Sequence, residues 1–141
     1  ANLRDADLRD ADLRDADLCG ANLCGANLRD AKNIPPLVSA LTSITPAGML
    51  TVYKKCCEGI VTLQIPANAA RSNATGRKCR AEYADVLETP DHEPAHSQHD
   101  ADFVYIEGAT VLPAEWCADR WQECAGGIHF FLRRVEAEAY S

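Results

Sequence analysis

The sequence predicts a β-rich protein in which an N-terminal coil of short extended segments precedes a small α+β domain. A five-residue unit recurs six times over residues 1–30, and each copy carries Leu at its third position. The paired prolines Pro35 and Pro36 end this pattern, and the rest of the chain alternates short β-forming runs with glycine and proline turns. We therefore expect a coil over residues 1–34, a cap or linker over 35–49 and an α+β domain over 50–141.

The period of five suits neither an α-helix nor a flat strand. On a helix, successive leucines would be rotated by about 140°, and on a strand they would alternate between the two faces. A single buried side results if the chain turns a corner once per repeat, so that Ala at the first position and Leu at the third both point inward. The other three positions hold Asn or Asp, then Arg or Cys, then Asp or Gly, which suit a turn and a polar exterior.

The unit A-(D/N)-L-x-x, kept through six consecutive copies, resembles the signature of the pentapeptide-repeat family. This resemblance implies a right-handed quadrilateral β-helix with four repeats per coil, of which the chain holds about one and a half coils. Leu3 would then stack under Leu23, and Leu8 under Leu28. Terminal repeats of a solenoid need a cap or a partner. Because Ala1 begins inside a repeat, we expect either further coils before it or a homodimer formed through the open end.

A short helix is expected after the repeat. Leu37, Val38, Leu41 and Ile44 have helical spacing, and Pro46 follows them, so the helix would cover the end of the coil. The remaining elements that we expect are a hairpin over 50–66 with its turn at Glu58 and Gly59, a strand rather than a helix over 78–88, a surface loop over 89–102, a second hairpin that joins 103–106 to 110–112, a short helix over 114–123, a buried strand over 128–132 and a terminal helix over 133–140.

Four later segments, GRKCRAEYADVL, SQHD, DFVYIEGATVLP and ECAGGIHFFLRRVEAEAY, together resemble a second family. It is the uncharacterised C-terminal domain that follows pentapeptide repeats in some bacterial and phage proteins. The resemblance spans roughly residues 53–140. It implies no known activity and no known catalytic residues.

Composition restricts the partners and the compartment. The formal net charge of −7 argues against a nucleic-acid partner, since such proteins usually present excess positive charge. No apolar run approaches the ~20 residues that span a bilayer. The seven cysteines, without an apolar leader, favour free thiols in the cytoplasm. We expect a cytoplasmic protein with no cofactor, no membrane association and a protein partner that the sequence does not identify.

One basic segment is a candidate anion site. Arg71, Arg77, Lys78 and Arg80 lie close in sequence with no acidic residue among them, and arginine offers a planar donor fork to phosphate or carboxylate. The simpler interpretation is a solvated loop whose arginines pair with surrounding acids.

One thiol and one imidazole suggest covalent chemistry. Cys124 and His129 flank a Gly-Gly turn, and His99 with Asp100 could complete a site in which histidine activates a thiolate and a carboxylate orients the ring. The simpler interpretation is a buried cysteine packed beside the glycines and a histidine held by a hydrogen bond in a strand.

A zinc site is the third possibility. Cys79, Cys117, Cys124 and His129 supply tetrahedral ligand types, yet no C-x-x-C pair anchors them, and so we expect no metal. Other residues have structural interpretations: Cys19 and Cys24 as surface thiols, Trp116 and Trp121 as core or junction anchors, and Tyr53, Phe103, Tyr105, Phe130 and Phe131 as core.

Together these features favour a non-enzymatic binding or structural protein. The β-helix would be a rigid interaction scaffold, and the C-terminal domain would cap it and bind a partner. The alternative is a cysteine-dependent hydrolase or transferase that uses Cys124 and His129. A hydrogen bond between these two side chains in an open cleft would favour the enzyme.

Overall fold

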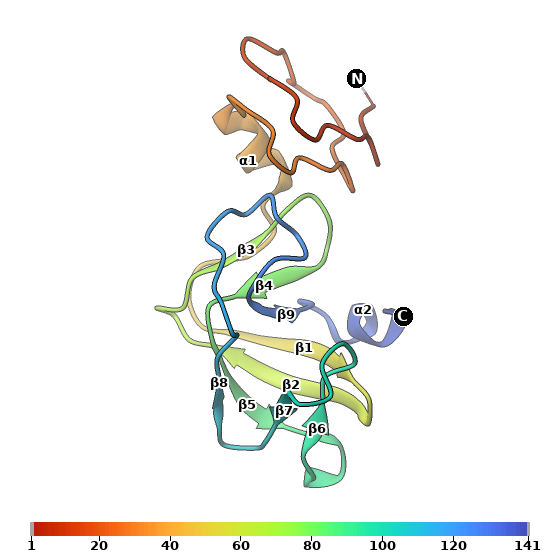
Figure 1. The fold of residues 1–141 in the computed structure, drawn as a ribbon, viewed down its shortest axis with the longest axis vertical. Coiled ribbons are helices and arrows are strands. Elements are labelled where there is room, and N and C mark those ends of the chain that lie inside the picture. The colour runs from red at the N-terminus through yellow and green to blue at the C-terminus, as the bar shows by residue number, and fades with distance from the viewer. Residues whose placement is uncertain (1, 141) are drawn as a thin grey trace.

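A computed structural model of the protein describes residues 2–140 and shows an elongated molecule with the repeats at one end (Figure 1). Strands dominate, in sheets of order β1-β2-β5-β8, β3-β4-β9 and β6-β7. No helix among residues 2–140 is long and apolar enough to cross a membrane. The elements are α1 (Pro36–Thr42), β1 (Leu50–Cys56), β2 (Gly59–Ile65), β3 (Arg71–Asn73), β4 (Cys79–Ala81), β5 (Ala84–Glu88), the 3-10 helix η1 (Pro90–His92), β6 (Ala95–His96), β7 (Val104–Tyr105), β8 (Thr110–Val111), β9 (Ile128–Phe130) and α2 (Arg134–Ala139).

The repeats pair with one another in a register of twenty residues, which is four repeats. Parallel bridges join Asn2 to Asn22, Asp7 to Asn27 and Asp12 to Lys32. Backbone hydrogen bonds follow the same register, as where the Leu8 N–H donates to the Asn27 carbonyl at 2.9 Å. These bridges place Leu3 beside Leu23 and Leu8 beside Leu28, as the resemblance to the pentapeptide-repeat family implies.

Each repeat closes with the same turn, and the turn explains the polar positions of the unit. The Ala N–H that opens one repeat donates to the carbonyl of the preceding Leu, from Ala6 through to Ala31. The fifth position has positive φ in every repeat, between 57° and 76°, which only Gly, Asn and Asp adopt readily. The second-position side chain accepts the N–H of the residue two places later in every repeat, as in Asn2 and Asp7.

The leucines face the inside of this winding, and α1 adds one residue to them. Leu13, Leu18, Leu23 and Leu28 are buried, while Leu3 and Leu8 are partly buried in the same cluster. Val38 of α1 is 0% exposed and belongs to that cluster, as expected of a helix that covers a coil end.

The helix α1 is shorter than the apolar spacing predicts, and fewer of its apolar side chains face the coil. It ends at Thr42, before Ile44, and Leu37 and Leu41 remain 42% and 45% exposed. The buried pair is instead Val38 and Thr42, whose hydroxyl donates to the Val38 carbonyl at 2.7 Å. A helix of two turns touches its neighbour along one narrow i, i+4 stripe, so the leucines beside the stripe stay in solvent.

The C-terminal domain confirms most of the expected strands and corrects others. β1 and β2 form the predicted hairpin, and residues 78–88 are strands in β4 and β5. The predicted hairpin over 103–112 is wrong, because β7 pairs with β6 and β8 pairs with β5. Residues 89–102, expected to be a loop, contain η1 and β6. Residues 114–123 contain no helix, while α2 and β9 lie where they were expected.

We predict that the inner leucines contribute unequally to stability. Leu28→Ala should lower the free energy of unfolding by roughly 2–5 kcal/mol, because Leu28 is 1% exposed and its removal leaves a cavity. Leu3→Ala is the matched control, because Leu3 is a partly buried copy of the same repeat position. It should lower the free energy of unfolding by less than half as much. Urea denaturation measures both, and equal losses would contradict the burial pattern.

Candidate functional site

A cavity of about 420 Å³ lies in the C-terminal domain, bordered by β1, β9, residues 97–103 and the end of the chain after α2. Its volume is within the roughly 300–1,000 Å³ of small-molecule sites. Aromatic side chains form much of its wall in two tilted pairs. The ring centroids of Phe103 and Tyr105 lie 5.2 Å apart, and those of Phe131 and Tyr140 lie 5.3 Å apart. An apolar body fits such a wall.

All four residues of the predicted catalytic set line this cavity: Cys124, His129, His99 and Asp100. They do not form the predicted relay. His129 lies within 2.9 Å of the Ala125 carbonyl through Nε2, and within residues 2–140 no hydrogen bond joins it to Cys124. His99 packs edge to face against the Tyr140 ring, and Asp100 accepts the N–H of Asp102. No carboxylate in the described part of the chain therefore orients the His129 ring.

Burial determines the protonation state of His129. It lowers the pKa of the imidazole to about 4, and the charges of Lys54, Lys78 and Arg80 act in the same direction against the opposing bond to Ala125. The ring is thus neutral at pH 7, and its proton lies on Nε2, since a carbonyl can only accept. A base of such low pKa removes a thiol proton poorly.

The four basic residues of the predicted anion site diverge in space. Arg71 donates to backbone carbonyls, including those of Ala69 at 3.1 Å and Pro66 at 2.6 Å. Arg77 makes two bonds to Glu136, at 2.6 and 2.9 Å. Of the four, Lys78 alone lines the cavity. The structure therefore does not bring the four side chains together: the three arginines bond to protein acceptors, whereas Lys78 faces the cavity.

Two lysines that the sequence analysis did not single out meet Lys78 at the cavity. Lys54 and Lys55 come from β1. Lys54 occupies the strand face of Val52 and Cys56, which are both buried, and burial lowers its pKa. A charged residue at an inward position of an alternating strand was the signal in the sequence.

The structure shows where the cysteines of the considered zinc site lie. Among residues 2–140, no group of three or more His, Cys, Asp or Glu side chains is placed to hold a metal ion. Cys79 is buried, which raises the pKa of its thiol to about 12, and the thiol lies 3.5 Å from the Arg77 carbonyl. A buried, protonated thiol of this kind is a poor metal ligand. Cys79, Cys117, Cys124 and His129 therefore do not form the tetrahedral site considered above.

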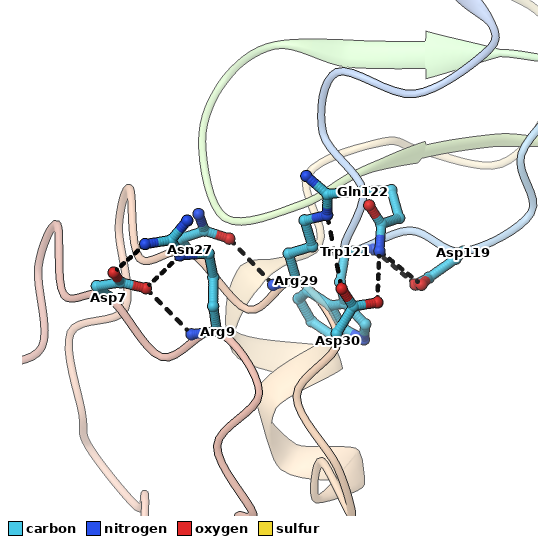
Figure 2. Close-up of polar contacts among 8 residues, drawn as sticks. All are labelled: Asp7, Arg9, Asn27, Arg29, Asp30, Asp119, Trp121 and Gln122. Atoms are coloured by element: carbon cyan, nitrogen blue, oxygen red, sulfur yellow. Dashed lines mark hydrogen bonds and ion pairs between the residues drawn. The ribbon is translucent and has the colours of Figure 1, made fainter.

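A second set of contacts joins the C-terminal domain to the repeats. The Gln122 side chain donates to Asp30 at 3.1 Å (Figure 2). The Thr75 hydroxyl donates to the Ala26 carbonyl, and Trp121 packs against the leucine cluster, which confirms its role as a junction anchor. A groove of about 460 Å³ lies along this junction.

Arg120 connects three elements at the junction. Its guanidinium donates to the carbonyls of Asn73 at 3.1 Å and Ala74 at 3.0 Å, and to the Thr42 hydroxyl at 2.9 Å. The same group lies 4.2 Å from the centroid of the Trp121 ring. Trp121 in turn touches the coil, so this arginine holds α1, the end of β3 and the coil together.

We predict an acid-dependent loss of stability that His129 causes. Its folded-state pKa of about 4 lies below the ordinary value of 6.5, so the unfolded chain binds its proton first. The free energy of unfolding should therefore fall as pH drops from 6.5 to 4, by up to about 3 kcal/mol. His129→Gln should remove this component in urea denaturation across that pH range.

His92→Gln is the control for this prediction, because Glu107 raises the pKa of His92 and its contribution has the opposite sign. The acid-dependent loss should persist in that variant. If the free energy of unfolding of the wild type falls with pH in parallel with that of His129→Gln, His129 is not a buried neutral imidazole.

Comparison with family models matches both parts of the chain. The model described as pentapeptide repeats (8 copies) matches residues 1–32. The model described as a family of unknown function (DUF5758) matches residues 41–137, more than half of the chain. Comparison with curated proteins and with solved structures finds no match. The chain belongs to this family of unknown function, with pentapeptide repeats preceding the family's domain.

Proposed function

We propose that this chain is a non-enzymatic binding protein. Its repeats form the end of a right-handed quadrilateral β-helix that is a rigid scaffold, and its C-terminal domain caps the scaffold and binds a partner. The observation that carries this proposal is the junction, where Arg120 and Trp121 tie the last coil, α1 and the C-terminal domain together while the cavity stays open.

The repeat geometry supports the scaffold role. The twenty-residue register and the identical turns are those expected of a four-sided coil. Backbone hydrogen bonds both close each turn and join neighbouring coils, so the stack has little freedom to bend. The outer face carries exposed charges that pair locally, as where Arg9 contacts Asp7 at 2.8 Å (Figure 2). Exposed pairs of this kind add little stability, which leaves the face available for contacts with another protein.

We predict that Arg120→Met uncouples the two parts. It removes the guanidinium that donates to the Asn73 and Ala74 carbonyls and to the Thr42 hydroxyl, and each acceptor that stays buried without a donor costs about 1–3 kcal/mol. The free energy of unfolding should fall by at least about 2 kcal/mol, and amide exchange at residues 21–28 should accelerate. Hydrogen exchange read by NMR measures both.

Arg134→Met is the matched control. Among residues 2–140, Arg134 pairs only with Glu138, in an exposed i, i+4 contact on α2, so its loss should change stability by less than about 0.5 kcal/mol. If Arg120→Met leaves exchange in the repeats unchanged, the C-terminal domain does not stabilise the scaffold and the proposal fails.

A cysteine-dependent hydrolase or transferase is the second candidate. The observation that favours it is the convergence of Cys124, His129, His99 and Asp100 on one cavity. It would require the His129 ring to leave the Ala125 carbonyl and to gain basicity, because its present pKa is low.

We predict that the chain does not turn over an activated ester through Cys124. p-Nitrophenyl acetate releases a visible product, and its hydrolysis should proceed at the same rate with wild-type protein and with Cys124→Ser. Cys19→Ser, at an exposed thiol in the repeats, is the control for non-specific thiol reactivity. A steady rate of many turnovers per chain, in which water hydrolyses the acetyl thioester and frees the thiol again, would establish the enzyme and overturn the binding proposal if it disappears in Cys124→Ser alone.

A further inference from the structure

Positive charge gathers at the cavity although the whole chain is acidic. Lys54, Lys55 and Lys78 all border it, while the chain carries a formal net charge of −7. Asp100 is the only carboxylate among the lining residues that the structure describes. Three of the four lysines of the chain thus lie at one site, which an acidic protein does not need for solubility.

The three lysines differ in the hydrogen-bond partners that the protein gives to their ammonium groups. Lys55 donates to the backbone carbonyls of Tyr140 at 2.7 Å and Glu138 at 3.4 Å, so its ammonium is occupied. Lys78 reaches the Tyr140 hydroxyl at 3.3 Å and lies 5.3 Å from the centroid of that ring. Within residues 2–140, Lys54 has no hydrogen-bond or ion-pair partner. Two of the ammonium groups therefore keep donors free for a ligand.

Lys54 is held in a place that is unfavourable for a lone charge. It projects from the face of β1 that also carries Val52 and Cys56, and burial together with the charge of Lys78 lowers its pKa. A partly desolvated ammonium beside another ammonium gains more from an anion than a solvated surface lysine does. An anion between the two groups would relieve both the desolvation and the repulsion.

The aromatic part of the cavity wall favours a ligand in which the anionic group is attached to an apolar body. Phe130 and Tyr105 are buried, and Phe103, Phe131 and Tyr140 are partly exposed toward the cavity. Rings at these spacings accept a flat apolar group better than a polar one. A bare inorganic ion would leave this apolar wall in contact with water.

We propose that this cavity binds a small organic anion, in which an aromatic or aliphatic body lies against Phe103, Phe131 and Tyr140 and a carboxylate or phosphate group lies between Lys54 and Lys78. This assignment rests on the proposed binding function and specifies the chemical class of its ligand. Lys54 and Lys78 are the recognition residues, and Lys55 is a positioning residue that fixes the backbone of residues 138–140 at the edge of the cavity.

Isothermal titration calorimetry of the full chain with four probes tests the proposal. 2-Naphthoate and 2-naphthyl phosphate carry the two candidate anions, 2-naphthamide is the neutral match, and inorganic phosphate lacks the apolar body. At least one of the two naphthyl anions should bind at least tenfold more tightly than both 2-naphthamide and inorganic phosphate. Which of the two binds more tightly identifies the headgroup. Equal affinity for 2-naphthamide, or no binding of either anion, would overturn the assignment.

Matched variants locate the binding. Lys54→Met and Lys78→Met keep the side-chain length and remove the charge, and each should weaken the preferred anion at least tenfold. Lys32→Met is the control at an exposed lysine of the repeats and should leave the affinity unchanged. Affinity that is unaffected in both cavity variants would place the anion elsewhere and overturn the assignment. The probe comparison uses wild-type protein alone, so it decides the question even if one variant does not fold.

The outcomes separate this inference from the proposed function. Failure of the anions to bind, with no turnover that depends on Cys124, would remove the ligand class and leave the scaffold and its junction in place. Turnover that depends on Cys124 would overturn the proposed function even if the anions bind.

Discussion

The irregular segment of residues 113–127 depends on one buried arginine, Arg80, for its shape. It contains no helix or strand, so its backbone carbonyls need donors from elsewhere. Arg80, 2% exposed, donates to the carbonyls of Cys117 at 2.9 Å, Asp119 at 2.8 Å and Gly126 at 2.7 Å. Within residues 2–140 no carboxylate pairs with it, so carbonyl dipoles and the Trp116 ring, 5.2 Å away, replace its hydration shell.

This segment connects the two parts of the molecule that carry the proposed function. At one point it supplies Arg120 and Trp121 to the junction with the coil, and a few residues later it supplies Cys124 and Gly127 to the cavity wall. Because Arg80 donates to carbonyls on both sides of residues 120–124, one buried side chain fixes the segment that reaches both the cavity and the coil. A buried arginine suits this task, since its five donors can serve several carbonyls and it stays charged at any physiological pH.

The cavity illustrates how an acidic chain can still recognise an anion. The acidic residues of the repeats lie on the outer face of the coil, where Asp5, Asp10 and Asp30 adopt the left-handed turn conformation. Three of the four lysines lie in the C-terminal domain, and two of these, Lys54 and Lys78, keep free donors at the cavity. Net charge therefore describes the long-range field of this protein, whereas the short-range field at the cavity is set by a few partly buried groups.

The sequence by itself determined the repeats, because their rules are local. The Asn or Asp of the second position bonds within its own turn, the fifth position needs Asp or Gly for its positive φ, and Leu28 points inward by periodicity alone. The resemblance to the two families, the β1–β2 hairpin and α2 were also readable from short segments. The spacing of Cys124 and His129 around a glycine turn suggested a shared site; both line the cavity, but His129 bonds to the Ala125 carbonyl.

Only the tertiary structure decided which distant groups meet. Val104 and Thr110 lie close in sequence, yet they joined different sheets, because strand pairing follows the best available edge rather than the nearest turn. Arg77 and Lys78 are adjacent, yet one pairs with Glu136 and the other reaches the cavity. Lys54 comes to the same cavity from another strand. Such contacts depend on the free energy of the whole packed domain, so short-range sequence patterns do not predict them.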